Sequence, residues 1–272
     1  PDKLEGATWL NYARCHDDIG LGFDDADIAR AGYDPSAHRG FLVEWFTGGF
    51  DDSPARGRPF GENLATGDAR IAGSLASLAG LESALESGDE DEIQRRIDLV
   101  LTLHGIILAF GGIPLLYYGD ELGTLNDYSY EQDQLRSDDA RWIHRPQMDW
   151  VRAEQRFERG SPEQRIFSGL RQMIAMRKET PAFADFNNRE LLDPESPHLF
   201  AFLRSHPVKP SERVLVVANF NDQPETLALD ELAGRGRFDQ GVLVDRISGS
   251  RLELEEGAVV VPPYGIVWAA AR

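Results

Sequence analysis

The pattern of apolar and polar positions changes character near residue 181. Before that point, short apolar runs alternate with segments of helical periodicity, a pattern typical of βα units built around a parallel sheet. Apolar runs at 7–14 and 113–118 predict two strands. Apolar residues that recur on one face predict helices over 90–110 and 162–178. We therefore predict an α/β architecture for residues 1–180.

After residue 181 the chain consists of short apolar runs separated by turn residues such as Asn221-Asp222 and Ser248-Gly249-Ser250. Several short strands at this spacing favour an antiparallel β-sandwich, and we assign it to a second domain at 181–272. The runs that predict strands are 199–204, 214–220, 226–229, 242–245, 252–254 and 259–261.

Residues 19–89 form a long insertion that is rich in glycine, proline and aspartate. Only the segments 25–30 and 38–45 within it have a helical pattern. Insertions of this size exceed ordinary loop lengths and commonly carry function.

Charge narrows the range of partners. A formal charge of −18 and a pI near 4.7 repel phosphate backbones and anionic lipid, so we expect neither nucleic acid nor a membrane as partner. A neutral sugar meets no such repulsion. Cys15 is the only cysteine and the six histidines have no ligand spacing, so we expect no metal and no cofactor. A cytoplasmic location fits this cysteine content best.

The run 7–14 ends in Cys15-His16-Asp17-Asp18, which places a histidine and two carboxylates at the C-terminal end of a predicted strand. In βα barrels the active site is assembled at this end of the strands. A solvated acidic turn is the alternative interpretation of these residues taken alone.

The context of these residues resembles the amylosucrase branch of the α-amylase superfamily, glycoside hydrolase family 13. The resemblance covers about the first 150 residues, and the later sandwich fits the family's C-terminal domain more loosely. Its motifs are the strand with His16-Asp17-Asp18, Gly48–Asp51, Ala55–Phe60, Thr66–Arg70, Gly111–Glu121, Gly123–Asp127 and Ser137–Pro146.

The resemblance implies a retaining mechanism in which a carboxylate nucleophile attacks the glucosyl carbon of sucrose and a second carboxylic acid protonates the departing fructose. Asp17 matches the acidic residue that holds sugar hydroxyls and stabilises the transition state, and His16 would donate to the same sugar. Asp18 and Arg70 match residues that contact the fructosyl unit. Arg141 matches an arginine that contacts the fructosyl unit and pairs with a carboxylate to close the pocket.

Other roles remain open at this stage for several of these side chains. Asp18 could cap the following turn, and both arginines could belong to ordinary ion pairs. Asp120 and Glu121 fit an organising role in neighbouring loops better than a catalytic one. Either packing or sugar stacking would account for the aromatic residues Tyr117, Tyr118, Trp142 and Trp150.

We therefore expect the fold to be the C-terminal part of a (β/α)8 barrel followed by an antiparallel β-sandwich. A complete barrel takes about 250 residues, and only two barrel strands are predicted in this chain. In the family the nucleophile and the acid/base lie upstream of His16. We expect a piece of a longer polypeptide, or a chain that pairs with the N-terminal part of the barrel, inactive alone.

The expected function of the complete protein is transfer of glucose from sucrose to an α-glucan. A sucrose hydrolase, an amylase or trehalose synthase-like enzyme and a noncatalytic carbohydrate-binding module are the alternatives.

Overall fold

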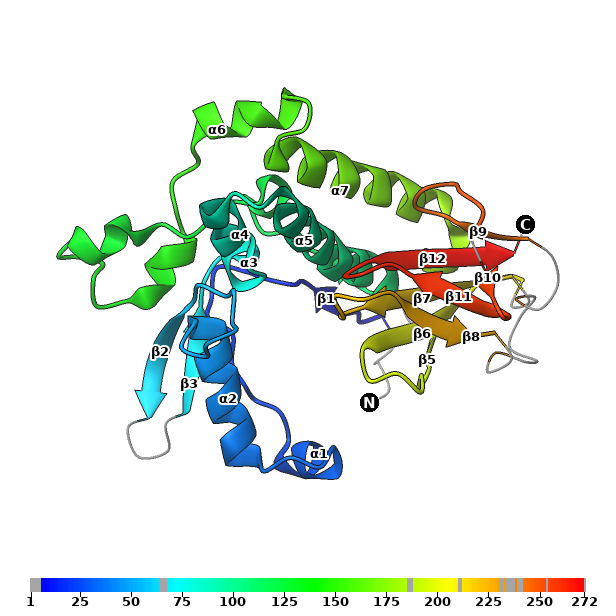
Figure 1. Cartoon of the computed structure of the whole chain (residues 1–272), viewed down its shortest axis with the longest axis horizontal. Helices are drawn as coiled ribbons and strands as arrows, with labels where there is room; N and C mark the ends of the chain where they lie inside the picture. The colour runs from blue at the N-terminus through cyan, green and yellow to red at the C-terminus, as the bar shows by residue number, and fades with distance from the viewer. Residues whose placement is uncertain are drawn as a thin grey trace. The chain divides into compact units, whose positions relative to one another are not determined.

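The computed structural model describes residues 6–63, 68–184, 188–209, 212–229, 232, 238, 242–252 and 254–271. Within these ranges the chain forms two compact units (Figure 1). The first contains Pro1–Ala13, Asp98–Leu115 and Arg165–Arg272, and the second contains Arg14–Ile97 and Leu116–Gln164. The predicted division into domains at residues 180 and 181 stays a prediction.

The first unit contains the predicted antiparallel sandwich. One sheet has the strand order β5-β6-β7-β12-β9 and the other β10-β11-β8. Strands β5 and β12 had no matching run in the hydrophobic pattern, whereas the other six fall within two residues of a predicted run. The bounds are Arg189–Leu191 (β5), Leu199–Ser205 (β6), Arg213–Asn219 (β7), Glu225–Ala228 (β8), Leu243–Asp245 (β9), Leu254–Glu255 (β10), Ala258–Val261 (β11) and Ile266–Ala271 (β12).

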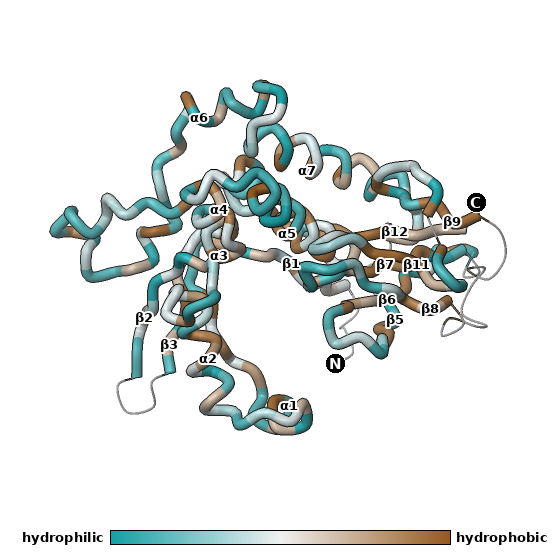
Figure 2. The backbone as a smooth tube through the Cα atoms, viewed as in Figure 1, coloured by the Kyte–Doolittle hydropathy of each residue, from teal (hydrophilic) through white to brown (hydrophobic). Residues whose placement is uncertain are grey.

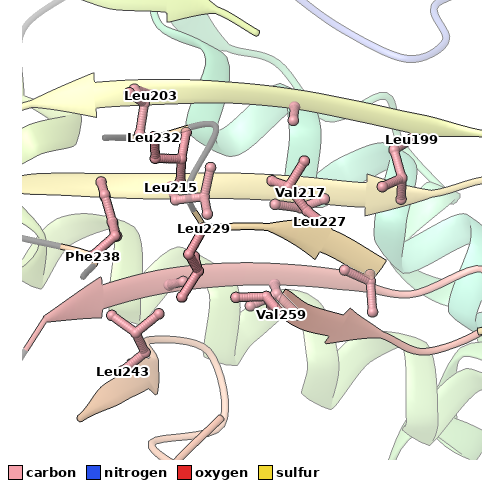
Figure 3. Packing of buried hydrophobic residues seen from close by; sticks show 14 residues of the cluster. Leu199, Leu203, Leu215, Val217, Leu227, Leu229, Leu232, Phe238, Leu243 and Val259 are labelled. Carbon is pink, nitrogen blue, oxygen red and sulfur yellow. The ribbon is translucent and has the colours of Figure 1, made fainter. Parts of the chain in front are cut away.

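The core of the sandwich lies between the two sheets (Figure 3). Leu203, Leu215 and Ala269 of the larger sheet meet Leu227 and Val259 of the smaller one, and all five are buried. Because side chains alternate across a strand, these positions share the inner faces. Burial of this apolar area stabilises the pair of sheets.

The other face of the larger sheet is covered by two helices, α5 (Glu90–Phe110) and α7 (Pro162–Glu179). Leu108 of α5 and Met173 of α7 pack in one cluster with Val216 and Trp268 of the sheet. Both helices were predicted over nearly these bounds. Figure 2 shows that the central sandwich strands are largely apolar.

The first unit also contains a short parallel pair, β1 (Leu10–Asn11) with β4 (Ile113–Pro114). The backbone nitrogens of Ile113 and Leu115 donate to the carbonyls of Trp9 and Asn11, each at 2.8 Å. Both strands are much shorter than predicted, because the regular ladder ends after two residue pairs. The parallel direction agrees with the predicted βα arrangement, in which α5 leads into the second strand.

The second unit is built largely from the insertion. Helix α1 (Asp25–Arg30) coincides with its prediction, and α2 (Pro35–Thr47) begins three residues before its prediction. Asp34 explains that start, since its side chain accepts from the Ala37 nitrogen and Pro35 follows at the first helical position.

Beyond these helices, the insertion contains the antiparallel hairpin β2 (Arg58–Asn63) and β3 (Asp68–Ala72) and the short helices α3 (Leu75–Leu78) and α4 (Leu81–Ser87). The hydrophobic pattern predicted none of them. Later loops of the unit carry helix α6 (Trp150–Glu154) and the 3-10 helices η1 (Asp120–Leu122), η2 (Tyr128–Gln132), η3 (Ala140–His144) and η4 (Gln155–Phe157), while η5 (Pro181–Phe183) belongs to the first unit. None of the helices in the described ranges has the length and hydrophobicity that a bilayer crossing requires.

Candidate functional site

The buried side chain of Arg14 anchors the turn at His16, Asp17 and Asp18. This arginine is 2% exposed and donates from Nε to the Gly73 carbonyl at 2.6 Å. Its Nη1 donates to the backbone carbonyl of Asp17. Burial lowers the pKa of Arg14, and neighbouring acidic groups partly offset that effect. One buried cation therefore ties the turn to the segment that follows β3.

Asp17 presents its carboxylate between two arginines and remains accessible. Its Oδ1 lies 3.3 Å from Nη1 of Arg141 and 3.6 Å from Nη2 of Arg145, while 51% of its side chain is exposed. The two guanidinium groups fix the orientation of this carboxylate while about half of its side chain stays exposed.

Asp18 is in a different environment, because its side chain is only 6% exposed. Its Oδ2 lies 3.2 Å from Nη1 of Arg70, and its Oδ1 lies 4.0 Å from Nη1 of Arg141. Asp18 thus bridges the two arginines that the sequence had placed far apart. The resemblance implies a ligand contact for Asp18, and this stays a prediction beside the two arginine contacts of its carboxylate.

Arg141 is held by Asp139, which sequence reasoning missed as a site residue. Two hydrogen bonds run from Nε and Nη2 of Arg141 to the two carboxylate oxygens of Asp139, each 2.9 Å long. The backbone nitrogen of Arg141 also donates to Asp139 at 3.0 Å. The side-chain hydrogen bonds from Arg141 are the main cause that lowers the pKa of Asp139, and they also raise the pKa of Arg141. An aspartate two residues before an arginine at a helix start could have suggested this turn.

His16 lies at the surface with 68% of its side chain exposed, and its Nε2 is 3.5 Å from Oδ2 of Asp17. The backbone of the same residue is firmly held. Its carbonyl accepts from Nε of Arg145 at 2.7 Å and from Nε2 of His144 at 3.0 Å. His16 therefore presents an exposed imidazole, next to the Asp17 carboxylate, from a fixed backbone position.

His144, the second residue that sequence reasoning missed, is 2% exposed. Its Nδ1 accepts from the Gly73 nitrogen at 3.1 Å, so the proton lies on Nε2, which faces the His16 carbonyl. Burial first, and the charge of Arg14 second, lower its pKa to about 4. A neutral His144 thus supports the backbone of the His16-Asp17 turn.

A shallow hollow of about 300 Å³ lies beside Arg70. Three glycines in its wall leave room next to the arginine, and the remaining lining residues are Leu21, Asn63, Asp68 and Ala69. A space of this size can accept one sugar unit.

The acidic pair after the second predicted strand organises its own loop. Glu121 accepts from the Gly119 nitrogen at 2.8 Å, and Asp120 is 6% exposed. Tyr118 donates from its hydroxyl to the Pro146 carbonyl at 2.7 Å, and burial raises the pKa of Tyr117. These contacts favour the structural interpretation of all four residues.

The remaining aromatic candidates differ from one another. The Arg136 and Arg145 guanidinium carbons lie 4.5 and 5.6 Å from the ring centre of Trp142, so this side chain packs against charge. Trp150 is 73% exposed at the start of α6.

Thr66 and Gly67, part of the motif that ends at Arg70, lie outside the described residues. In the described part of the chain, no three His, Cys, Asp or Glu side chains are grouped to hold a metal ion.

Comparison with known proteins adds independent information on the family. Residues 189–268 match the family described as Maltogenic Amylase, C-terminal domain. A structure of an AmyP variant in complex with maltotriose is similar to this chain with a TM-score of 0.51 and 16% identity, over 72% of this chain and 38% of that one.

Two pullulanases are similar at lower TM-scores. The enzyme from Paenibacillus barengoltzii, in complex with maltohexaose and α-cyclodextrin, gives 0.48 with 23% identity over 72% of this chain and 28% of its own. The enzyme from Bacillus acidopullulyticus gives 0.49 with 20% identity over 73% and 23%. The chain thus spans well under half the length of each of these proteins.

The fold class predicted from the sequence is confirmed: an α-amylase-type barrel portion is followed by a C-terminal domain of antiparallel sheets. The match at residues 189–268 concerns the C-terminal domain, and the likeness to the AmyP variant concerns the fold.

Proposed function

We propose that this chain, whose residues 189–268 match the maltogenic amylase C-terminal domain, supplies the sugar-holding side of the active site of a retaining α-glucosyl-transferring enzyme. The observation that carries the proposal is the environment of Asp17. Its accessible carboxylate lies between Arg141 and Arg145 on a turn that also carries the exposed His16.

In this proposal Asp17 accepts hydrogen bonds from sugar hydroxyls, and these bonds strengthen as the ring acquires positive charge in the transition state. Its negative charge also favours the oxocarbenium-like ring electrostatically. His16 donates to the same sugar. The nucleophile and the acid/base belong to other strands of the barrel and are assigned to no residue of this chain.

We propose sucrose as the glucosyl donor, following the resemblance to the amylosucrase branch. Arg70, together with Asn63 and Asp68, lines the hollow of about 300 Å³, which would receive the fructosyl unit. Asp18 orients Arg70 for this contact through their ion pair. An α-glucan is the proposed acceptor, and the AmyP variant that shares this fold was solved with maltotriose.

The parallel strands β1 and β4 support the need for a barrel partner. The large apolar side chains of Trp9, Leu10, Ile113 and Leu115 on and beside them are 38–59% exposed. Exposed apolar area of this kind costs about 25 cal/mol per Å². Further βα units, from the same polypeptide or from a companion chain, would cover these side chains and bring the two missing carboxylates.

The polypeptide that carries this chain should be assayed with sucrose, with maltotriose, and with both. Fructose release that requires sucrose, with growth of the glucan, supports the proposal. Fructose and glucose in equal amounts without glucan growth would indicate a hydrolase, and cleavage of maltotriose with sucrose untouched would indicate an amylase. No turnover of either sugar would overturn the catalytic proposal.

A further inference from the structure

Phe60 of β2 contacts both arginines of the proposed fructosyl side. The guanidinium carbon of Arg70 lies 5.0 Å from the centre of its ring, and that of Arg141 lies 4.6 Å away. Phe60 is the Cα partner of Arg70 in the β2–β3 hairpin, whereas Arg141 approaches from η3. One aromatic ring therefore brings together side chains from two separate segments of the same unit.

Asp18 joins the same two arginines through its carboxylate, one oxygen toward each. The four groups form one assembly in which two cations share one anion and one aromatic ring. The electron-rich face of an aromatic ring attracts a guanidinium group, and it reduces the penalty for bringing two cations close together.

Arg70 depends on this assembly more than Arg141 does. Half of its side chain is exposed, at 52%, and an exposed arginine with a single ion pair retains much rotamer freedom. Arg141 has its own support from the two hydrogen bonds of Asp139. Removal of the Phe60 ring should therefore loosen Arg70 first.

Gly61, the residue after Phe60, leaves space for the guanidinium group of Arg70. Gly61 has a φ of +63°, and a Cβ atom there would lie 2.8 Å from Nη2 of Arg70. The missing side chain lets the guanidinium group lie against the backbone of β2. Phe60 and Gly61 together form a surface against which the Arg70 guanidinium group packs. The ion pair with Asp18 and the hairpin register do not supply this packing by themselves.

We propose that Phe60 is a positioning residue, which orients Arg70 and Arg141 toward the fructosyl unit without itself touching the substrate. This inference rests on the proposed function for its kinetic consequence. Its structural claim, that the ring orders both guanidinium groups, stands separately.

The test compares Phe60→Leu, which keeps apolar volume without an aromatic face, with Phe60→Tyr, which keeps the face. Phe157→Leu is the matched control, because the Arg156 guanidinium carbon lies 4.2 Å from the centre of the exposed Phe157 ring, outside the candidate site. The polypeptide that carries the chain is used throughout.

Sucrose kinetics give the first readout. Phe60→Leu should lower kcat/KM for sucrose about tenfold, mainly through a higher KM, and should change an activated aryl glucoside less than about threefold. Phe60→Tyr should restore most of the sucrose activity, and Phe157→Leu should match the wild type. Equal losses on both substrates, or equal losses in the Leu and Tyr variants, would overturn the positioning role.

Side-chain nitrogen NMR gives the second readout, which needs no turnover. Arg70 and Arg141 should show ordered Nε–H groups with ring-current shifts in the wild type, and Phe60→Leu should abolish the shifts and raise the mobility of Arg70. Unchanged spectra would refute the inference. If Phe60→Leu fails to fold, contacts between the Phe60 ring protons and both arginines in wild-type spectra decide the structural claim.

The two readouts also separate the inference from the proposed function. A wild-type protein that never cleaves sucrose refutes the proposed function, and the NMR result alone then decides on Phe60. A wild type that cleaves sucrose, with full activity in Phe60→Leu, refutes the inference and leaves the proposed function intact.

Discussion

His144 donates from Nε2 to the carbonyl oxygen of His16 at 3.0 Å, so a buried imidazole holds the backbone of the residue next to Asp17. This contact needs the neutral ring with its proton on Nε2, because Nδ1 accepts from the Gly73 nitrogen. The protonation of one buried group is thereby linked to the geometry of the turn that carries the proposed stabilising carboxylate.

Acid should destabilise the protein through His144. Its pKa is about 4 when folded and near 6.5 when unfolded, so the unfolded chain binds more protons between these values. The stability contributed by the neutral ring is complete above pH 6.5 and is lost as the pH falls toward 4. The contribution is on the order of 3 kcal/mol.

Chemical denaturation across this pH range measures the effect. His144→Gln should flatten the pH dependence of the free energy of unfolding relative to wild type. An NMR titration in which the His144 ring protonates near pH 6.5 would refute the assignment.

Loss of the Asp139 carboxylate, which accepts two hydrogen bonds from the Arg141 guanidinium group, should impair activity more than stability. Asp139→Asn keeps the shape but removes the charge and one acceptor, so Arg141 should lose its fixed orientation toward Asp17 and Asp18. We expect kcat/KM for sucrose to fall about tenfold or more. Asp133→Asn, which weakens a surface pair with Arg136, is the control. Equal activity in the two variants would argue against a role of Asp139 in orienting Arg141.

Arg14 should be a structural requirement of the turn. Arg14→Met retains volume but leaves the Gly73 carbonyl and the Asp17 carbonyl without this donor. The expected loss in the free energy of unfolding is about 3 kcal/mol, because a buried charged network is broken. Urea denaturation checks this expectation, and a loss below about 1 kcal/mol would contradict the anchoring role.

Arg70→Ala separates the two sides of the proposed substrate. The variant should lose about tenfold to a hundredfold in kcat/KM for sucrose, with a smaller loss on an activated aryl glucoside that lacks a fructosyl unit. Arg30→Ala removes an exposed arginine from a surface ion pair with Asp27 and is the control. Equal losses of the Arg70 variant on both substrates would exclude a fructosyl contact.

The sequence predicted the elements whose patterns are local. Helix α5 has a long, regular apolar face, and the strands of the sandwich alternate or continue as apolar runs, so period alone identified them. The β2–β3 hairpin escaped prediction because Arg58–Asn63 has almost no apolar alternation, and its pairing depends on contacts to η3 and α2. The predicted lengths of β1 and β4 were too great, because the apolar runs continue beyond the two residue pairs that form the parallel hydrogen-bonded ladder.

The candidate site shows the same division. The resemblance identified Asp17, Asp18, Arg70 and Arg141, and the structure brings them together within one unit. Their roles toward a sugar stay predictions. His144 and Arg145 act on a backbone carbonyl about 130 positions away in the chain, and no local pattern encodes such a contact.

The central claim concerns the charge of Asp17. The most direct test is the turnover number for sucrose of Asp17→Asn in the polypeptide that carries this chain, with the exposed Asp52→Asn as control. We predict a fall in kcat of about a hundredfold to a thousandfold with an unchanged melting temperature, since the shape is kept and the charge is lost. A kcat within about twofold of the wild type would contradict the account.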